Sequence, residues 1–336
     1  MKRTPPPVAE LLPARQYVER ATACIDAAEK HVTLFTMIIT QDGSTAKLID
    51  ALCAAAKRGV SVRVAADIFT LGVMSAETAG LPWRNRGIRS ARHMRNRLKK
   101  SGVKFSWIGQ LGPVIYAQRT HVKWLIVDQD VFCFGGVNLY KNGLQHIDYM
   151  LRMHDPQLGE DLETEHTRIH RADRTGNTYR SHSFPCLAGT VLVDGGLFGN
   201  SIIYRRACEL TEKAAHVLLV SQYAPSGRLT RLLATKSSAV YYNRWQYAFG
   251  MNKWLLRFGV FFSKQATQYR GKRYIHAKFL IATMPDGSKT AISGSHNFNR
   301  GGVVLGTREV ALETTDPSVI AQLETFHQTY IANAKA

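Results

Sequence analysis

Two short stretches of the sequence carry a histidine and a lysine two residues apart, each followed by an apolar run. The first stretch is HVKWLIVD, with His121 and Lys123, and the second is IHAKFLIA, with His276 and Lys278. Side chains alternate between the two faces of a strand, so residues two apart point the same way. Each pair therefore places an imidazole beside an ammonium group at the start of a predicted buried strand.

A glycine-containing turn and an asparagine follow each pair, and an acidic residue follows each asparagine. These residues are Gly135, Gly136, Asn138 and Asp148 in the first copy, and Gly294, Ser295, Asn297 and Glu309 in the second. The copies differ where the apolar run ends, because Asp128 of the first copy corresponds to Thr283 of the second. Two matched copies arise by chance far less often than a single His-x-Lys pair, so the sequence predicts an internal duplication.

The repeated residue types suit displacement at the phosphorus of a phosphodiester. A neutral imidazole is a suitable nucleophile toward this anion because its pKa lies near working pH. Lysine and asparagine side chains can hold the non-bridging oxygens as charge develops on them. A second, protonated imidazole can donate to the leaving oxygen and then deprotonate an incoming alcohol or water. This chemistry needs no metal and no other cofactor, and we expect none.

The elements that must position these residues alternate between strand and helix. Apolar strands predicted over 31–39 and 216–223 each precede a helix followed by a strand, at 49–69 and 225–243. Such alternation predicts an α/β architecture with a largely parallel or mixed sheet in each half of the chain.

The pattern H-x-K-x4-D-x6-G-G-x-N, complete in the first copy, resembles the phospholipase D superfamily, whose members cut or exchange phosphodiesters. The resemblance extends from about Tyr17 to about Tyr330. It implies a duplicated phospholipase D-like domain with two mixed β-sheets flanked by helices and an active site at the pseudo-twofold interface. We expect the first half at 1–175 and the second at 176–336.

The resemblance also implies roles for the repeated residues. His121 is expected to be the nucleophile that forms a phosphohistidine, and His276 the general acid and then the general base, although pseudo-symmetry leaves the reverse assignment open. The residues expected to bind the phosphate are Lys123, Lys278, Asn138 and Asn297, with Ser295 and Gly136 also assigned to substrate binding.

The acidic residues of the motif are assigned to the catalytic set as well. Asp148 and Glu309 are each expected to hold a histidine in its productive tautomer. Asp128 belongs to the same motif, and its replacement by Thr283 is expected to disturb support of the second half more than its chemistry. Both halves are therefore expected to be competent.

The high positive net charge favours a polyanionic binding partner. The formal net charge is +19, which attracts nucleic acid or an anionic membrane surface. Residues 83–100 contain eight Arg and Lys and no acidic residue, which suits either partner, although most charge runs are simply solvated helices. Residues 241–264 interleave nine aromatic residues with basic ones, a pattern typical of an interfacial element that does not span the bilayer. Core packing or stacking on single-stranded bases would use the same aromatic residues.

Apolar segments and cysteine content indicate where in the cell the protein is expected. No apolar run approaches the roughly 20 residues that span a bilayer, and no apolar stretch follows the basic N-terminal residues. Five cysteines without C-x-x-C spacing indicate a reducing compartment, with neither a disulfide framework nor a zinc site. The pair His166 and His170 is interpreted as part of a solvated connector. We expect a cytoplasmic protein, peripheral on the inner face of the cell membrane.

The sequence therefore predicts a phosphatidyltransferase resembling the cardiolipin, phosphatidylglycerophosphate and phosphatidylserine synthases of the superfamily. It would act on a lipid substrate at an anionic phospholipid surface, through a phosphohistidine. The alternatives are a phospholipase D-type hydrolase or a metal-independent nuclease with the same histidines. A third alternative is a basic binding protein whose second half is inactive. The acceptor alcohol and the oligomeric state are not predicted.

Overall fold

The computed structural model describes residues 7–71, 86–109, 118–247, 253–254, 256–257, 263 and 265–334. Parts of the predicted basic run (83–85) and of the aromatic segment (248–252, 255, 258–262 and 264) lie outside the described residues.

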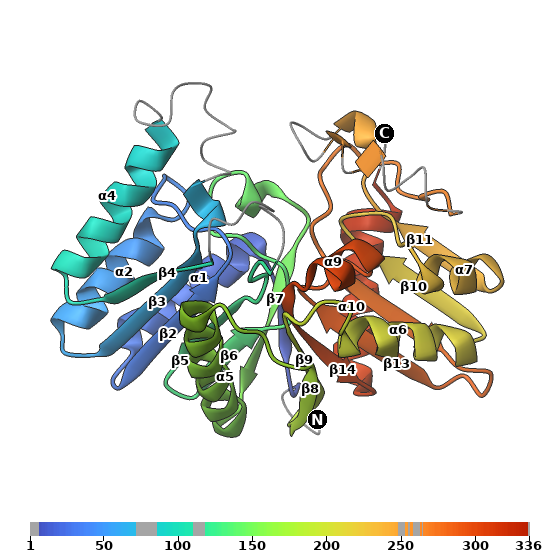
Figure 1. Cartoon of the computed structure of the whole chain (residues 1–336), viewed down its shortest axis with the longest axis horizontal. Helices are drawn as coiled ribbons and strands as arrows, with labels where there is room; N and C mark the ends of the chain where they lie inside the picture. The colour runs from blue at the N-terminus through green and yellow to red at the C-terminus, as the bar shows by residue number, and fades with distance from the viewer. Residues whose placement is uncertain are drawn as a thin grey trace, which may run out of the picture.

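Each half of the chain forms one seven-stranded mixed sheet, and the two sheets lie side by side (Figure 1). The first has the order β1-β7-β6-β5-β2-β3-β4, and the second has the order β11-β10-β12-β13-β14-β9-β8. The strands of the first sheet are β1 Glu10–Pro13, β2 His31–Thr36, β3 Ser61–Asp67, β4 Lys104–Ile108, β5 Trp124–Val127, β6 Asp130–Cys133 and β7 Tyr149–His154. Those of the second are β8 His182–Cys186, β9 Gly189–Gly195, β10 His216–Val220, β11 Ser237–Tyr241, β12 Phe279–Thr283, β13 Lys289–Gly294 and β14 Arg308–Thr314.

In both sheets the strand–helix–strand units pair in parallel and the remaining neighbours pair antiparallel. The parallel pairs are β2–β3, β3–β4 and β10–β11. The predicted fold class, a duplicated α/β domain with mixed sheets, is confirmed.

Helices cover both outer faces and fill the space between the sheets. Apolar residues of α1, α2 and α4 pack on the first sheet, and those of α6 and α7 pack on the second. Residues of α5 and α10 belong to a third cluster that draws on both sheets. The bounds are α1 Ala14–Ala27, α2 Ala46–Lys57, α4 Arg86–Lys100, α5 Pro156–Thr175, α6 Ile202–Lys213, α7 Arg228–Ala234, α9 Arg300–Leu305 and α10 Pro317–His327, with short turns of helix at η1 Gly143–Gln145, η2 Trp245–Tyr247 and η3 Gln328–Ala332.

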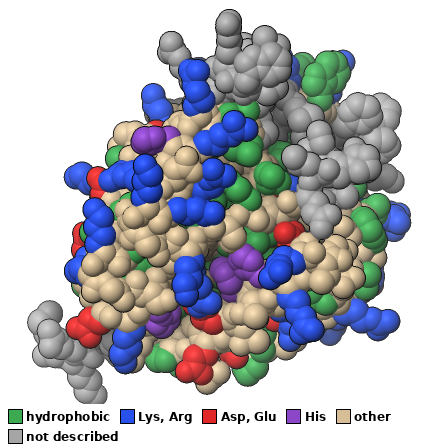
Figure 2. Space-filling view, turned by 60° about the vertical axis from the view of Figure 1, so that its left-hand side comes forward, with side chains coloured by type: hydrophobic (Ala, Val, Ile, Leu, Met, Phe, Trp, Pro, Cys, Tyr) green, Lys and Arg blue, Asp and Glu red, His purple; other side chains and the backbone are tan. Residues whose placement is uncertain are grey.

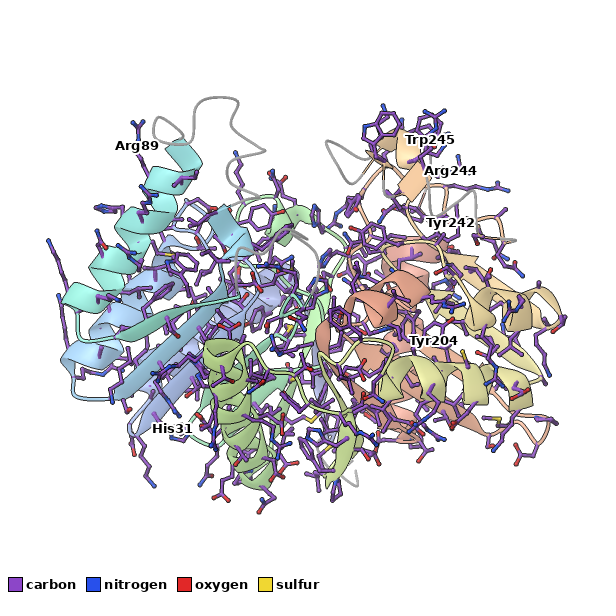
Figure 3. The ribbon with its side chains drawn as sticks, viewed as in Figure 1. His31, Arg89, Tyr204, Tyr242, Arg244 and Trp245 are labelled. Carbon is purple, nitrogen blue, oxygen red and sulfur yellow. The ribbon has the colours of Figure 1, made fainter. Side chains whose placement is uncertain are left out.

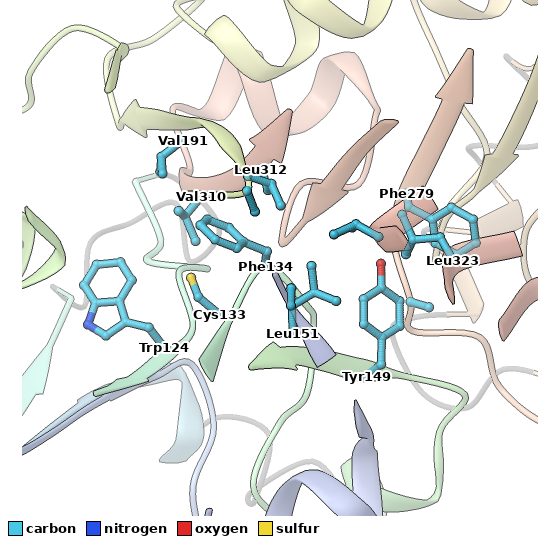
Figure 4. Packing of buried hydrophobic residues seen from close by; sticks show 14 of the residues in the cluster. Trp124, Cys133, Phe134, Tyr149, Leu151, Val191, Phe279, Val310, Leu312 and Leu323 are labelled. Carbon is cyan, nitrogen blue, oxygen red and sulfur yellow. The ribbon is translucent and has the colours of Figure 1, made fainter. Parts of the chain in front are cut away.

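The central cluster joins the two halves into one core. Trp124 and Tyr149 of the first half pack in the same cluster as Val310 and Leu323 of the second (Figure 4). A buried hydrogen bond of 2.6 Å links the hydroxyl of Tyr149 to that of Ser293, across the boundary between the halves. Separating the halves would expose this core to water, at a cost of about 25 cal/mol for each Å² of apolar surface.

The position of His166 corrects one expectation. Residues 166–170 lie in α5 rather than in a solvated connector, and the imidazole of His166 is buried with its ring centroid 5.2 Å from that of Phe35. The helix spans the layer between the sheets, so one of its faces must be buried, and His166 lies on that face.

Strand direction puts both His-x-Lys segments at one edge of the molecule. β5 runs antiparallel to β2 with Trp124 opposite Phe35, so the residues before β5 lie where β2 and β3 end. In the second half Phe279 of β12 is opposite Val220 of β10, which gives the same arrangement. The topology therefore brings the two predicted motifs to equivalent edges before any side-chain contact is considered.

Asp128 lies at the other end of β5 from His121. The sequence groups it with the catalytic residues, but its carboxylate accepts hydrogen bonds from the backbone N–H groups of Glu29, Lys30 and His31 at 2.9, 3.0 and 2.9 Å. These bonds hold the turn that leads into β2. In the second half the equivalent turn is held through the backbone, where Ala215 N–H donates to the carbonyl of Thr283 at 2.8 Å.

We predict that Asp128→Ala lowers the free energy of unfolding by about 1–3 kcal/mol, because three backbone donors lose their acceptor. Partial burial raises the pKa of Asp128, but the three donors outweigh it and the pKa is lowered. The stabilisation is therefore present at neutral pH and is lost as the pH falls through that lowered pKa. Urea unfolding at pH 7 checks this. The control Asp286→Ala removes an exposed turn carboxylate that accepts from Ser288 alone, and an equal loss in both variants would contradict the prediction.

Candidate active site

Each histidine of the two His-x-Lys motifs is paired with a carboxylate from the opposite half. Nδ1 of His121 lies 2.9 Å from Oε1 of Glu309, and Nδ1 of His276 lies 2.7 Å from Oδ2 of Asp148. Both carboxylates are buried. The sequence predicts that these carboxylates hold the histidines, and the structure adds that the pairing crosses the boundary between the halves.

Backbone hydrogen bonds explain why each histidine meets the carboxylate of the other half. His121 N–H donates to the carbonyl of Arg308 at 2.8 Å, and His276 N–H donates to the carbonyl of Ile147 at 2.9 Å. Arg308 and Ile147 each immediately precede the carboxylate in question. Short parallel bridges, Thr120 with Arg308 and Ile147 with Ile275, thus lay each histidine segment beside the other half's carboxylate.

Gly136 and Ser295 occupy equivalent positions and hold the two carboxylates. Gly136 N–H donates to Oδ1 of Asp148 at 3.2 Å, and the hydroxyl of Ser295 donates to Oε2 of Glu309 at 2.5 Å. A Cβ at Gly136 would lie 2.8 Å from Oδ2 of Asp148 and 2.9 Å from the carbonyl of His276, so only glycine fits there. A direct role of either residue in binding substrate stays a prediction.

The two lysines are buried beside the histidines. Nζ of Lys123 donates to the carbonyl of His121 at 2.8 Å, and Nζ of Lys278 donates to the carbonyl of His276. Both ammonium groups interact electrostatically with Asp148 and Glu309, so two cations and two carboxylates share one small buried region.

The two asparagines of the motif retain an open hydrogen-bonding site. The side-chain oxygens of Asn138 and Asn297 are buried and accept no hydrogen bond within the described part of the chain. Buried amide oxygens without a partner are costly, so a ligand that engages these side chains would be stabilised.

Burial shifts the protonation of the site. Burial lowers the pKa of Lys278 to about 7 and also lowers the pKa of Lys123. Burial and the charges of both lysines hold the pKa of His276 well below its ordinary value. Burial raises the pKa of Glu309, but the contact with His121 outweighs it and the pKa falls to about 2. Without a bound anion, His276 is therefore neutral at neutral pH.

Two further histidines, His146 and His296, lie at the site, and the sequence motifs did not single them out. The ring centroid of His146 is 5.7 Å from that of His276. His296 is buried between Ser295 and Asn297, and its Nδ1 accepts from Phe298 N–H at 2.9 Å, which places the imidazole proton on Nε2. His296 stands inside the GSHN motif, a signal that sequence reasoning could have used.

Polar side chains also fix the residue before each motif histidine. Asp67 accepts from Thr120 N–H at 3.0 Å and from the guanidinium of Arg119 at 3.1 Å. In the second half the amide oxygen of Asn243 accepts from Ile275 N–H at 2.7 Å. The equivalent support is thus charged in the first half and neutral in the second.

This arrangement can stabilise a phosphoryl group between two imidazoles. The residues brought together are His121, Lys123, His276, Lys278, Asp148 and Glu309, with Ser295 and Gly136 supporting the carboxylates; Asp128 lies at the opposite sheet edge. Within the described residues no cluster of three or more side chains could hold a metal ion, and no helix is long and apolar enough to cross a bilayer.

We predict that sulfate binding weakens above pH 7. Sulfate keeps its charge between pH 6 and 9, whereas Lys278 loses its proton as the pH rises through its pKa of about 7. The affinity should fall by up to about tenfold for each further pH unit. Calorimetry at several pH values checks this, with Lys278→Arg as a variant that keeps its charge. A pH-independent wild-type affinity, or the same slope in Lys278→Arg, would contradict the prediction.

A family model and several solved structures are similar to this chain. Residues 22–169 match the family model described as cardiolipin synthase, PLD-like domain. The fold is similar to that of phosphatidylserine synthase from Haemophilus influenzae, with a TM-score of 0.70, 14% identity, and coverage of 96% of this chain and 85% of that one. It is also similar to polyphosphate kinase from Porphyromonas gingivalis, with a TM-score of 0.59, 13% identity, and coverage of 94% of this chain and 49% of that one. The search of curated proteins gave no match.

The family match covers the first His-x-Lys motif, and the fold similarity covers both halves. Residues 22–169 therefore match a phospholipase D-like domain, and the second half of the chain repeats the fold of the first.

Proposed function

We propose that the protein is a phosphatidyltransferase that moves a phosphatidyl group from a phospholipid or CDP-activated lipid to an alcohol. The observation that carries this proposal is the pair of imidazole–carboxylate contacts, His121 with Glu309 and His276 with Asp148, beside two buried lysines. The family model is described as cardiolipin synthase, and a solved structure of similar fold is a phosphatidylserine synthase. Both descriptions support a lipid substrate.

The reaction proceeds in two displacements. Nε2 of His121 attacks phosphorus while Glu309 holds its Nδ1 proton, the bond from phosphorus to the leaving oxygen breaks, and His276 protonates that oxygen. His276 then removes the proton of the acceptor hydroxyl, whose oxygen attacks phosphorus and breaks the P–N bond. The bound phosphodiester anion offsets the charges of Lys123 and Lys278, which raises the pKa of His276 so that it can carry the proton.

His121 is assigned as the nucleophile because its side chain is the more accessible one. It is 22% exposed, whereas the side chain of His276 is 10% exposed. A nucleophile must reach phosphorus directly, whereas an acid–base group needs to reach only a proton.

An anionic membrane surface is the partner that fits the edge at which this site opens. The N-terminal end of α4 and the segment after β11 both lie at the sheet edge that carries the His-x-Lys pairs. Figure 3 places Arg89, Arg244 and Trp245 along one edge of the molecule and His31 at the opposite edge. Arg89 and Arg92 of α4 are exposed, and Figure 2 shows Lys and Arg side chains gathered on one face.

The aromatic segment divides between core and surface. Tyr242 is buried, as the core alternative requires, whereas Trp254 is 61% exposed. The guanidinium of Arg257 lies 5.6 Å from the ring of Trp245 and 5.8 Å from that of Trp254. Exposed tryptophan beside basic side chains suits the headgroup region of a bilayer.

The cytoplasmic, inner face of the membrane is the location we propose. All five cysteines are free thiols, and Cys53, Cys133 and Cys208 are buried, which suits a reducing compartment. The inner leaflet also supplies the anionic surface that a chain of charge +19 attracts.

We predict that His121→Ala abolishes lipid turnover. The protein is incubated without added metal with vesicles of phosphatidylglycerol and CDP-diacylglycerol plus glycerol, glycerol phosphate and serine, and the lipids are read by mass spectrometry. A new phospholipid should form, and His121→Ala should lower its rate by at least about three orders of magnitude. The control His154→Ala replaces an exposed histidine remote from the site.

The other outcomes of this assay discriminate between the alternatives. Phosphatidic acid without a new phospholipid would identify a hydrolase. No lipid turnover together with metal-independent cleavage of DNA or RNA would identify a nuclease. Full activity of His121→Ala would contradict the mechanism.

We predict that reversing three charges on α4 weakens membrane binding. The variant is Arg89→Glu, Arg92→Glu and Arg95→Glu together, all within the first three turns of α4. Each basic residue near an anionic surface contributes about 1 kcal/mol, so affinity for phosphatidylglycerol vesicles should fall by roughly a hundredfold in sedimentation at 0.1 M salt. A control that reverses Arg205, Lys213 and Arg231, on the outer helices of the second half, makes the same charge change. Equal losses in the two variants would mean that only net charge matters.

A further inference from the structure

We infer that the acceptor alcohol binds on the His276 side of the site, where Tyr274 and Gln222 recognise its hydroxyl groups. This inference rests on the proposed transferase function and names the part of the site that selects the acceptor. It follows from a difference between the two halves at equivalent positions.

The residues two positions before each catalytic histidine differ in kind. Arg119, before His121, forms a buried ion pair with Asp67, so this side chain is engaged within the protein. Tyr274, before His276, is uncharged, and its hydroxyl accepts from the amide of Gln222 at 3.2 Å. Because this bond uses the oxygen of Tyr274 as an acceptor, the phenolic O–H remains available to donate. Burial raises the pKa of Tyr274 to about 12, so that proton is retained.

The residues two positions before each carboxylate differ as well. His146, before Asp148, packs against His276 and Tyr274 in tilted ring contacts, with ring centroids 5.7 and 4.9 Å away. Its buried Nδ1 has no hydrogen-bond partner within the described residues. Thr307, before Glu309, instead donates its hydroxyl to the carbonyl of Gly302 at 3.3 Å. Uncharged polar side chains therefore adjoin His276, whereas at the equivalent positions beside His121 Arg119 pairs with Asp67 and Thr307 donates to Gly302.

The chemistry requires the acceptor on this side. In an in-line displacement the attacking and leaving atoms lie on opposite sides of phosphorus. The acceptor oxygen displaces Nε2 of His121, so it must approach from the side of His276, which removes its proton. The neutral hydrogen-bonding groups tied to that side by the contacts above are the Tyr274 hydroxyl, the side-chain oxygen of Gln222 and Nδ1 of His146. They suit a small alcohol with further polar groups and give no advantage to a simple alkyl alcohol.

The test measures how the phosphoenzyme partitions between an alcohol and water. Glycerol, glycerol phosphate and serine are each offered, with 1-propanol as a probe that has a hydroxyl and no second polar group. The ratio of new phospholipid to phosphatidic acid is read for the wild type, Tyr274→Phe and Gln222→Leu. This ratio does not depend on the amount of folded enzyme.

For at least one polar acceptor the ratio should fall roughly fivefold to tenfold in both variants, as expected for one lost hydrogen bond. The ratio for 1-propanol should stay within about twofold. Thr307→Val, at the position equivalent to His146 on the other side, should leave every ratio unchanged.

Unchanged ratios in Tyr274→Phe and Gln222→Leu for all three polar acceptors would overturn the inference while leaving the transferase function intact. A similar fall in Thr307→Val would overturn it too, since the effect would then not belong to the His276 side. A wild type that turns over no lipid would refute the proposed function itself.

Discussion

The site depends on two short backbone bridges that cross between the halves. His121 and His276 each donate a backbone hydrogen bond to the residue that precedes the other half's carboxylate. With that register fixed, each carboxylate meets its histidine, and Gly136 and Ser295 reach the carboxylates in turn. The shared core around Tyr149 and Val310 holds the bridges in place, because a shift of the halves would expose apolar surface and break both contacts.

Burial of so many charges defines the chemistry of the site. Two ammonium groups and two carboxylates out of water are costly, and burial lowers the pKa of both lysines in response. Lys278, with a pKa of about 7, is only partly protonated in the absence of a ligand. An anionic phosphodiester supplies the negative charge that the lysines lack, so the site is more favourable electrostatically with substrate than without it. The protein thereby selects an anion before any bond is broken.

The sequence predicts the duplication and the fold because both follow from local patterns. Histidine, lysine and asparagine recur at matched spacings, and alternating helices and strands indicate mixed sheets. Which carboxylate meets which histidine could not be predicted, because this depends on the register between two sheets far apart in the chain. The position of Asp128 could not be predicted for a related reason, because a motif groups residues by spacing, whereas the two ends of a strand lie at opposite edges of the sheet.

The sequence also does not show which side chains of a polar helix or of an aromatic segment are buried. The segment that contains His166 and His170 has the polar composition expected of a solvated connector. In the structure it belongs to α5, which lies between the two sheets, and His166 is buried. In the aromatic segment, Tyr242 faces the core and Trp254 faces solvent, and composition alone does not separate them.

The exchange of carboxylates means that neither half contains a complete site. Two identical halves in a symmetric dimer would form the same contacts, but every substitution would then appear on both sides at once. Joining the halves in one chain removes that constraint and makes their association independent of protein concentration. Arg119 and Tyr274 illustrate the result. They occupy equivalent positions in the two halves, but Arg119 forms a salt bridge and Tyr274 offers a hydroxyl group. The two sides of a pseudo-symmetric site thus carry different side chains and can perform different roles.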